Sequence, residues 1–403
     1  MTTIDQPLSA GGAPIADWVD MGEMQRDPYE TYRRLREMGS LVWVPALNRY
    51  MCTTYTGCRA LEADQETFSA WVPTSKIARA LGSQPMVSKD DPEHAVERAP
   101  INRSMRPKNI REFWAPLFER NARISLDELM AAGPEQADLN RDFAGLLAAR
   151  NLTDMLGFTD ARPADMIRWS HAFIAGTANL QEDPAVWERV DAAHREVGEA
   201  LHELVPFYRE HPNSSMISAW ANSGISLDAV YTSVKLAIAG GLNEPQHMVS
   251  TMVWALTEHP DQRDLLFAEP ARWAEAFDEA IRLVSPIGSV SRIVLRETTL
   301  EGVDLPVGAV VGVVLAAANH DPEVFERPEE FDITRPRVSH LGFGSGVHQC
   351  AGHWAARIGI GEIAVPMLYR ELPGLRIDPR RPANWSGWVF RGVENAPVTW
   401  DAA

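Results

Sequence analysis

A glycine-rich stretch around one cysteine near the C-terminal end constrains this chain more than any other feature. Six specified positions fall within the ten residues 343–352, which read Phe-Gly-x-Gly-x-His-x-Cys-x-Gly. Glycines adopt backbone angles closed to other residues and let a flat ligand approach the main chain. The residues after Cys350 have a helical pattern, so Cys350 is expected at a helix start, where amides and the helix dipole stabilise a thiolate. Such a thiolate can ligate a haem iron, whereas a lone buried cysteine in a turn would be inert.

Composition limits the classes of protein to which the chain can belong. Its 403 residues are 45% hydrophobic, enough for a sizeable core, and its formal net charge is −17. We find no apolar run near the roughly 20 residues that span a bilayer and no signal-peptide pattern. Three cysteines are too few for a disulfide framework, and the negative charge argues against nucleic acid and anionic membranes as partners. These features predict a cytoplasmic protein.

The order of patterns along the chain predicts one large domain that is mainly α with a minor β region. Residues 1–20 are small, polar and rich in Pro and Gly, which predicts a flexible N-terminal tail before a domain over 21–403. Helical spacing dominates 105–230. Strand-like runs occur at 41–45, 49–54, 292–297 and 309–316.

A histidine and an arginine lie four residues apart in a segment that begins with Asp91-Pro92. The Asp-Pro step predicts a helix start, which places His94 and Arg98 on one helix face. Two donors on one face can clamp a carboxylate. Taken alone, such a pair is more often a solvated surface.

A long apolar helix is expected over 231–256, with an interruption in its middle. Gly240, Gly241 and Pro245 predict a kink, because proline lacks an amide hydrogen and clashes with the preceding turn. Asn243 and Glu244 fall at this kink. Buried polar groups there are costly without a function or bound water, although a simple bend in a core helix is the alternative.

Three other patterns bear on the site. Glu279-Ala-Ile-Arg282 places an acid and a base three apart on a helix, which alone indicates an ordinary surface ion pair. Residues 68–88 predict a loop whose apolar side chains either line a pocket or attach the loop to the core. Residues 385–392 predict an aromatic, glycine-rich hairpin.

Together these motifs resemble the cytochrome P-450 superfamily, in its soluble bacterial form, over roughly residues 25–400. The resemblance implies a b-type haem with Cys350 as the iron ligand. It also implies that Arg335 completes a buried network with Glu279 and Arg282. Other cofactor-binding residues that it implies are His94, Arg98, Arg292, Phe343, His348 and Gly352, with Val290 and Ser291 near the haem.

The helix over 231–256 corresponds to the oxygen-binding helix of that family but departs from its pattern. The usual acid–alcohol pair, which relays protons, is replaced by Asn243 and Glu244, so Glu244 is expected to hold water or donate protons itself. With Gly240 and Gly241, these residues form the expected catalytic group. The expected substrate-binding residues are Trp71, Ile77, Leu81, Phe173, Val290, Ser291 and Phe390.

The finer resemblance is to bacterial aromatic O-demethylases that act on guaiacol-type methoxyphenols. It rests on Asn243-Glu244-Pro245, on the ending 387–392 and on Val398-Thr-Trp400. We expect Phe173 and Phe390 to clamp a small aromatic substrate. Alternatives are hydroxylation of another small apolar compound such as a terpenoid or alkylbenzene, a peroxide-driven peroxygenase, and a haem sensor or carrier.

Electron supply is expected to come from another protein. We find neither a glycine-rich nucleotide-binding motif nor a ferredoxin-type cysteine cluster in the sequence. The expected partner is therefore a ferredoxin with its reductase, or a multidomain reductase, using NAD(P)H.

Overall fold

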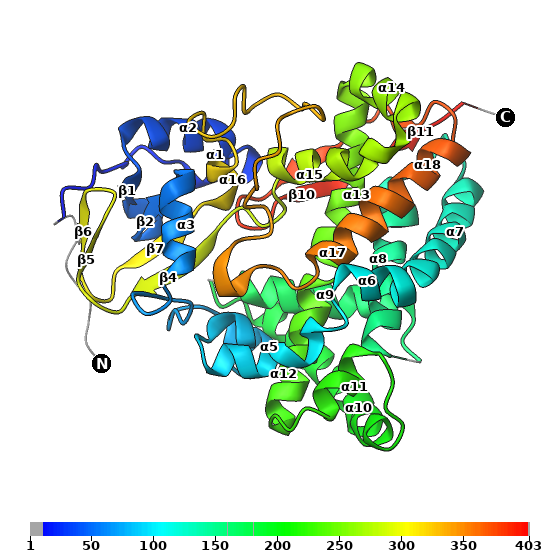
Figure 1. Cartoon of the computed structure of the whole chain (residues 1–403), viewed down its shortest axis with the longest axis horizontal. Helices are drawn as coiled ribbons and strands as arrows, with labels where there is room; N and C mark the ends of the chain where they lie inside the picture. The colour runs from blue at the N-terminus through cyan, green and yellow to red at the C-terminus, as the bar shows by residue number, and fades with distance from the viewer. Residues whose placement is uncertain (1–10, 159, 180, 402–403) are drawn as a thin grey trace.

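The computed structural model describes residues 11–158, 160–179 and 181–401, and it is mostly helical with a small sheet region (Figure 1). The N-terminal strands and the strands of residues 290–313 form one side of the molecule, and helices from the middle of the chain form the other. This arrangement confirms the expected fold class. Among the described helices, none combines the length and apolar character needed to cross a membrane.

The main sheet joins the N-terminal strands to strands from the last third of the chain. Its order is β1-β2-β7-β4-β3, with β2 parallel to β7 and the other neighbours antiparallel. These strands are β1 (Leu41–Val44), β2 (Arg49–Cys52), β3 (Phe68–Ser69), β4 (Val290–Val294) and β7 (Val310–Val313). The expected strand at 309–316 ends early, because Leu315–Ala318 turns into the short helix α16. The sheet thus brings the first residues of β4 beside the helical body.

The prediction of a flexible tail at 1–20 is wrong for residues 11–20. Residues 1–10 lie outside the described residues. The Ala16 amide donates a hydrogen bond of 2.9 Å to the Trp43 carbonyl, and Trp43 in turn donates to Pro14. Ala16 and Val19 are buried against the sheet. Apolar burial and main-chain pairing with β1 therefore hold this segment, despite its small and polar composition.

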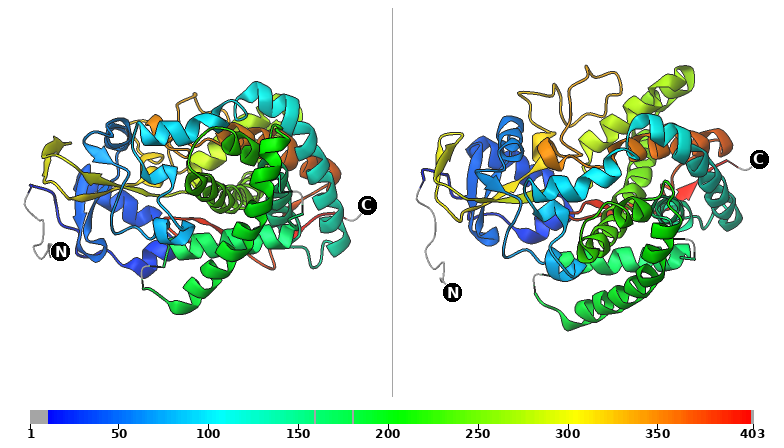
Figure 2. Two further views of the ribbon diagram at one scale, coloured as in Figure 1. Left: turned by 90° about the horizontal axis from the view of Figure 1, so that it is seen from below. Right: turned by 60° about the horizontal axis from the view of Figure 1, so that its bottom comes forward.

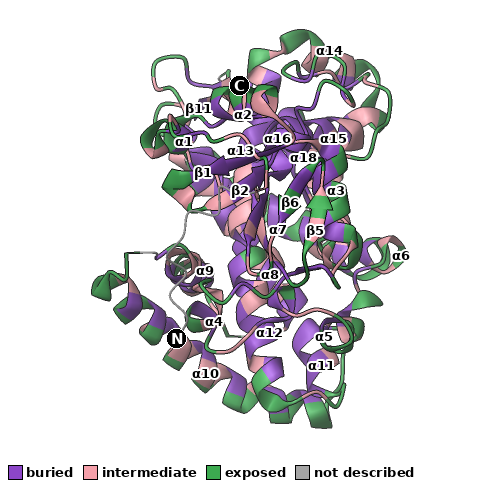
Figure 3. Ribbon diagram, turned by 90° about the vertical axis from the view of Figure 1, so that its left-hand side faces the viewer, coloured by how far each residue is buried: buried purple, intermediate pink, exposed green. Residues whose placement is uncertain are grey.

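The helical side packs around a broken central helix, and its outermost member is the long helix α10 (Figure 2). Exposed and buried residues alternate along α10, as expected for a helix that covers a core (Figure 3). The helices that precede the break are α1 (Met21–Arg26), α2 (Tyr29–Met38), α3 (Tyr55–Ala63), α4 (Ile77–Leu81), α5 (Glu93–Asn102), α6 (Pro107–Asn109), α7 (Ala115–Ala132), α8 (Gly145–Leu156), α9 (Pro163–Thr177), α10 (Pro184–Glu210), α11 (Met216–Ala221) and α12 (Leu227–Gly240). The segments Ile110–Trp114 and Asn140–Ala144 are π-helical.

The interrupted helix is confirmed, but its break precedes Pro245 by a full turn. Helix α12 ends at Gly240 and α13 (Asn243–Glu258) begins after a turn at 241–242. A proline removes the amide that would bond to the carbonyl four residues earlier and its ring crowds that carbonyl, which here belongs to Gly241. The lost hydrogen bond and the steric crowding therefore fall at Gly241, where the helix breaks. Side chains on both sides of the break belong to apolar cores.

The C-terminal third completes the cover of α13. The expected hairpin is confirmed as β9 (Asn384–Ser386) and β10 (Gly392–Asn395), with Ser386 opposite Gly392. The predicted loop at 68–88 is more ordered than expected, because it contains α4 and a turn of 3₁₀-helix at Met86–Ser88. The remaining elements are α14 (Pro260–Ala268), α15 (Trp273–Leu283), α16 (Leu315–Ala318), α17 (His353–Ala356), α18 (Val365–Glu371), the π-helical segment Arg357–Ala364, β5 (Thr298–Leu300), β6 (Val303–Leu305), β8 (Arg376–Ile377) and β11 (Val398–Thr399).

Candidate active site

The cysteine loop forms a tight turn whose backbone closes on itself. The Cys350 amide donates to the Phe343 carbonyl at 2.9 Å, and the Gly344 amide donates to Leu341 at 2.8 Å. Gly344 and Gly346 have φ values of 64° and 63°, in the region that favours glycine. The glycines are therefore needed for the turn that presents the Cys350 side chain.

Cys350 lies just before α17 and retains accessible surface although it is inside the protein. Burial raises the pKa of its thiol, whereas the amides of Gly352 and His353 and the Arg98 guanidinium lower it. The expected stabilisation of the thiolate at a helix start is thus present, but in the protein alone burial outweighs it. A metal ion that binds the sulfur would reverse this balance, because a coordinating thiol is deprotonated.

Two imidazoles beside the loop have buried nitrogens without partners. The His94 and His348 rings lie 4.4 Å apart between their centroids. His94 Nδ1 lies 3.1 Å from the Asp91 carboxylate, whereas His94 Nε2 and both ring nitrogens of His348 lack any hydrogen-bond partner. Burial and nearby positive side chains hold the pKa of His348 down, at about 3. Unpartnered buried nitrogens of this kind call for an acceptor.

Two arginines, Arg98 and Arg292, lie close enough to His348 for their charges to act on it. The Arg98 guanidinium donates to the Gln349 carbonyl at 2.7 Å. Buried Arg292 lies 3.8 Å from the Glu62 carboxylate, which also accepts from Ser345 at 3.0 Å. Burial raises the pKa of Glu62 and Arg292 lowers it. The analysis of the sequence missed Glu62, whose only signal was a carboxylate on the apolar face of a helical pattern.

These residues fit a haem with two carboxylate groups. Two observations test this fit. A propionate would satisfy the orphaned nitrogens on His94 and His348, and the Cys350 sulfur keeps accessible surface. Arg98 and Arg292 supply positive charge, and the carboxylates of Glu62 and Asp90 both act on Arg292. Their role as cofactor-binding residues stays a prediction, which this geometry supports.

The Glu279–Arg282 pair is a buried structural network, as the resemblance implied. Arg282 forms two hydrogen bonds of 2.8 Å with Glu279, and Arg335 lies 3.2 Å from the same carboxylate. Arg282 also donates to the carbonyls of Asn319 and Pro328 at 3.0 and 2.7 Å. The network therefore ties α15 to the long segment that precedes the cysteine loop.

The break between α12 and α13 faces the cysteine loop with a carboxyl group. Asn243 Nδ2 lies 3.4 Å from Glu244 Oε1, and Glu244 Oε2 is buried without a partner. Burial raises the pKa of Glu244 to about 7, and its charge acts on Cys350. Gly240 is exposed although Ala239 before it is buried, and a methyl group added to Gly240 would touch nothing. A methyl group on Gly241 would crowd Leu152. Open space therefore adjoins Gly240 at the break.

The expected substrate residues do not all come together. Phe390 and Val290 are partly accessible, and Ile287 pairs with Phe390 through a β-bridge that places the hairpin beside β4. Ser291 accepts a hydrogen bond of 3.0 Å from Arg49. Ile77 is half-buried at the start of α4.

Three of the expected substrate contacts are corrected by their surroundings. Phe173 has no exposed surface, and its ring packs 5.4 Å from that of His194 in the helical core. Leu81 is equally enclosed, in the same core. Trp71 is 37% exposed, on a turn whose backbone amide bonds to Ser69, so its ring faces outward. Local packing, which a pattern of apolar residues cannot specify, decides these orientations.

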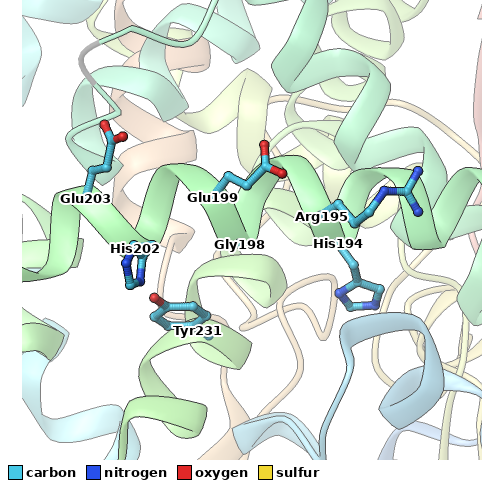
Figure 4. Close-up of a pocket in the computed structure, with 7 residues that line it drawn as sticks. All are labelled: His194, Arg195, Gly198, Glu199, His202, Glu203 and Tyr231. Atoms are coloured by element: carbon cyan, nitrogen blue, oxygen red, sulfur yellow. The ribbon is translucent and has the colours of Figure 1, made fainter.

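A cavity of about 530 Å³ lies elsewhere, at the outer surface between α10 and α12 (Figure 4). His194, His202 and Tyr231 point into it, and Glu199 and Glu203 point away. None of the expected site residues lines it. It is therefore separate from the cysteine loop and from Glu244.

Comparison with known proteins agrees with this geometry. Residues 253–368 match the family model described as Cytochrome P450. The monooxygenase PikC of Streptomyces venezuelae is 28% identical, over 98% of this chain and 96% of its own length. Cytochrome P450 CYP199A2 of Rhodopseudomonas palustris is also 28% identical, over 92% and 90%. The solved structure of myxobacterial CYP267B1, in complex with myristic acid, is 26% identical with a TM-score of 0.83, over 95% and 98%.

The sequence left open whether the chain is an enzyme or a haem sensor or carrier, which has no turnover. The matches with named monooxygenases indicate an enzyme. The buried acid–base network occupies the place that the resemblance implied. The chain belongs to the cytochrome P450 superfamily, whose members bind protoporphyrin IX haem, and it is a haem-thiolate monooxygenase.

Proposed function

We propose that this monooxygenase removes the methyl group of a small methoxyphenol of the guaiacol or syringol type, releasing formaldehyde and a catechol. The observation that carries the proposal is the position of Phe390. The hairpin β9–β10 pairs the Phe390 backbone with that of Ile287 and leaves Phe390 partly accessible, near Val290 at the start of β4. An aromatic ring beside aliphatic side chains suits a small, flat and largely apolar substrate.

The described side chains account for binding and for exclusion of water. A phenyl ring packs on a flat aromatic in an offset or edge-to-face manner, worth roughly 0.5–1.5 kcal/mol beyond burial. The Gly288 amide donates to the Val389 carbonyl at 2.8 Å, which holds the hairpin tip against the strand. This tie keeps Phe390 in place while the substrate enters.

The chemistry is divided between the cofactor and the protein. Bound haem supplies the reduction of dioxygen and the transfer of one oxygen atom, while the other atom leaves as water. Glu244 holds a proton close to neutral pH and delivers it at the break in the helix. The methoxy carbon of the substrate is hydroxylated, and the resulting hemiacetal collapses to formaldehyde and the catechol.

Electrons are supplied by a separate protein in this proposal. The partner is a ferredoxin with its reductase, or a multidomain reductase, that draws on NAD(P)H in the cytoplasm. An assay with purified candidate donors, scored by NAD(P)H oxidation that depends on both proteins, tests this part.

The substrate is tested by titration and product analysis. Guaiacol should shift the spin state of the ferric haem and yield formaldehyde in turnover, and Phe390→Ala should weaken its binding about tenfold. Phe207→Ala removes an exposed ring far from the hairpin and should change nothing. If methoxyphenols give neither response while a terpenoid or alkylbenzene gives both, demethylation is wrong and hydroxylation of another small apolar compound replaces it.

A peroxide-driven reaction is the second candidate, favoured by the buried carboxyl of Glu244 in place of an alcohol. A carboxylate near the reaction centre can assist cleavage of the O–O bond of hydrogen peroxide by general acid–base catalysis. Turnover with peroxide alone, at a rate close to that with NAD(P)H and reductase, would support it. Loss of that activity in Glu244→Gln would assign it to this residue.

A further inference from the structure

Two buried polar atoms without partners lie one helical turn apart on α13. They are Oε2 of Glu244 and Nδ1 of His247. Residues three apart face the same way on a helix, with about 5–6 Å between their Cβ atoms. Leaving either atom unsatisfied is costly, so a bound water between them is the natural way to satisfy both. Helical spacing therefore places the two side chains on the same face of α13.

The ring of His247 is fixed from the opposite side by the C-terminal hairpin. A hydrogen bond with the Val393 backbone favours its protonated form, and the Gly392 Cα lies against the ring, where a side chain would collide with it. Donation to a carbonyl from one ring nitrogen leaves the other as an acceptor. Nδ1 is that acceptor here, because it is the ring atom that is buried without a partner.

A third titratable side chain lies between His247 and solvent. His171 is exposed on α9 and close enough to His247 for its charge to lower the pKa of that residue. Helix α9 is tied to the break because Ser170 Oγ donates to the Ala239 carbonyl at 3.3 Å. The three side chains therefore run from the surface to the cysteine loop, where the charge of Glu244 acts on Cys350.

The pKa values of the inner pair suit movement of a proton from His247 to Glu244. Burial lowers the pKa of His247 to about 4, and burial raises the pKa of Glu244 to about 7. A proton that reaches His247 therefore passes downhill to a Glu244 carboxylate. Among the described residues, the charged or titratable groups that act on this pair are His171 on His247 and Cys350 near Glu244.

We propose that His171, His247 and Glu244 form a proton path from solvent to the oxygen-binding side of the active site. Solvent protonates His171, the proton passes through water to Nδ1 of His247, and from there to Oε2 of Glu244. Glu244 then gives the proton up at the site and becomes a carboxylate again. One proton enters for each cycle of the path and no electrons move. The two histidines act through Glu244, and the path holds for any substrate.

The decisive measurement follows the Glu244 carboxyl itself in the resting holoenzyme. Its C=O stretching band is identified as the infrared band that Glu244→Gln removes, and its hydrogen–deuterium exchange is timed after mixing with D2O. His247→Gln keeps an amide donor for Val393 but cannot carry a proton, and should slow exchange about tenfold or more. His171→Gln should slow it about threefold, because water can replace an exposed group in part.

The matched control is His202→Gln, the same substitution at an exposed helical histidine on α10. It should leave the exchange rate and the product formed per NAD(P)H unchanged, whereas His247→Gln should lower that yield. Unchanged exchange in both His247→Gln and His171→Gln overturns the proposal. Slow exchange in His247→Gln alone supports the inner step and removes His171 from the path. If His247→Gln does not retain haem, the exchange rate of the Glu244 carboxyl in His171→Gln alone tests the proposal.

Discussion

The Arg98 guanidinium donates a hydrogen bond of 2.7 Å to the carbonyl oxygen of Gln349, the residue before Cys350. This bond connects α5 directly to the cysteine loop, so one side chain orients the loop and adds positive charge beside it. Loss of a hydrogen bond from a charged group costs about 2 kcal/mol. Arg98→Ala should therefore release haem roughly 30-fold faster, measured by transfer to an acceptor apoprotein. Arg103→Ala, an exposed change at the end of α5, should release it at the normal rate.

Cys350 should be the sole source of the thiolate spectrum. Cys350→Ala is expected to lose the red-shifted Soret band of the ferrous CO complex, because the thiolate pushes electron density to the iron. Cys58→Ala is the control, since Cys58 is buried against the Cys52 carbonyl in the sheet region. A red-shifted band that persists in Cys350→Ala would refute the ligand assignment.

Breaking the buried acid–base network should destabilise the whole domain. Arg282→Ala leaves the buried carboxylate of Glu279 with only Arg335 and the Asp332 amide and orphans two carbonyls, so we expect a loss of about 3–5 kcal/mol. The free energy of unfolding in denaturant measures it. Arg162→Ala, which breaks the exposed Arg162–Asp165 pair, should have no measurable effect. Equal stability of the two variants would contradict a structural role for the network.

Gly346 should tolerate no side chain. Its φ is 63°, and an added methyl group would collide with the Glu62 carbonyl on α3. Gly346→Ala should lose about 1–3 kcal/mol of stability and part of its haem. Gly302 also has a positive φ, but a methyl group added to it would meet open space. Gly302→Ala therefore introduces the backbone strain without the collision. Haem loss confined to Gly346→Ala would separate the two effects.

Glu244 should make stability depend on pH. Its pKa rises from 4.5 to about 7 on folding, because burial disfavours the carboxylate. The folded state therefore holds a proton that the unfolded state has lost between these values, and stability falls as the pH rises through this range. The full penalty, about 3 kcal/mol, applies above pH 7. Glu244→Gln should thus be more stable than the natural protein at pH 8 but not at pH 4.5, measured by denaturant unfolding at both.

Motif spacing predicted those parts of the site whose chemistry needs particular residue types. Cys350, His94 and Arg98 were predicted this way, because a ligand and its neutralising charges cannot be exchanged for other residues, and their roles stay predictions. The break in the central helix was predicted for the same reason, since Pro245 has a defined effect on the backbone. Gly240 and Gly241 were part of that prediction, but the sequence did not show that the helix breaks there and not at Pro245, because the strain acts four residues away.

The remaining features depend on orientation, which a single sequence does not specify. Phe173 and Trp71 are both aromatic, yet one is enclosed beside His194 and the other faces solvent. Glu62 and His247 are chemically important only because the fold places Arg292 and Gly392 against them. Contacts between segments more than a hundred residues apart determine these roles.

The unpartnered nitrogens of His94 and His348 have a consequence for the lifetime of the protein in the cell. A ligand that binds only the folded state adds to its stability by mass action, and about 4 kcal/mol is gained at a thousandfold excess over the dissociation constant. Newly made chains that find no haem keep these buried nitrogens unsatisfied and open more often. Proteases degrade the open form, so the amount of this protein follows the supply of haem.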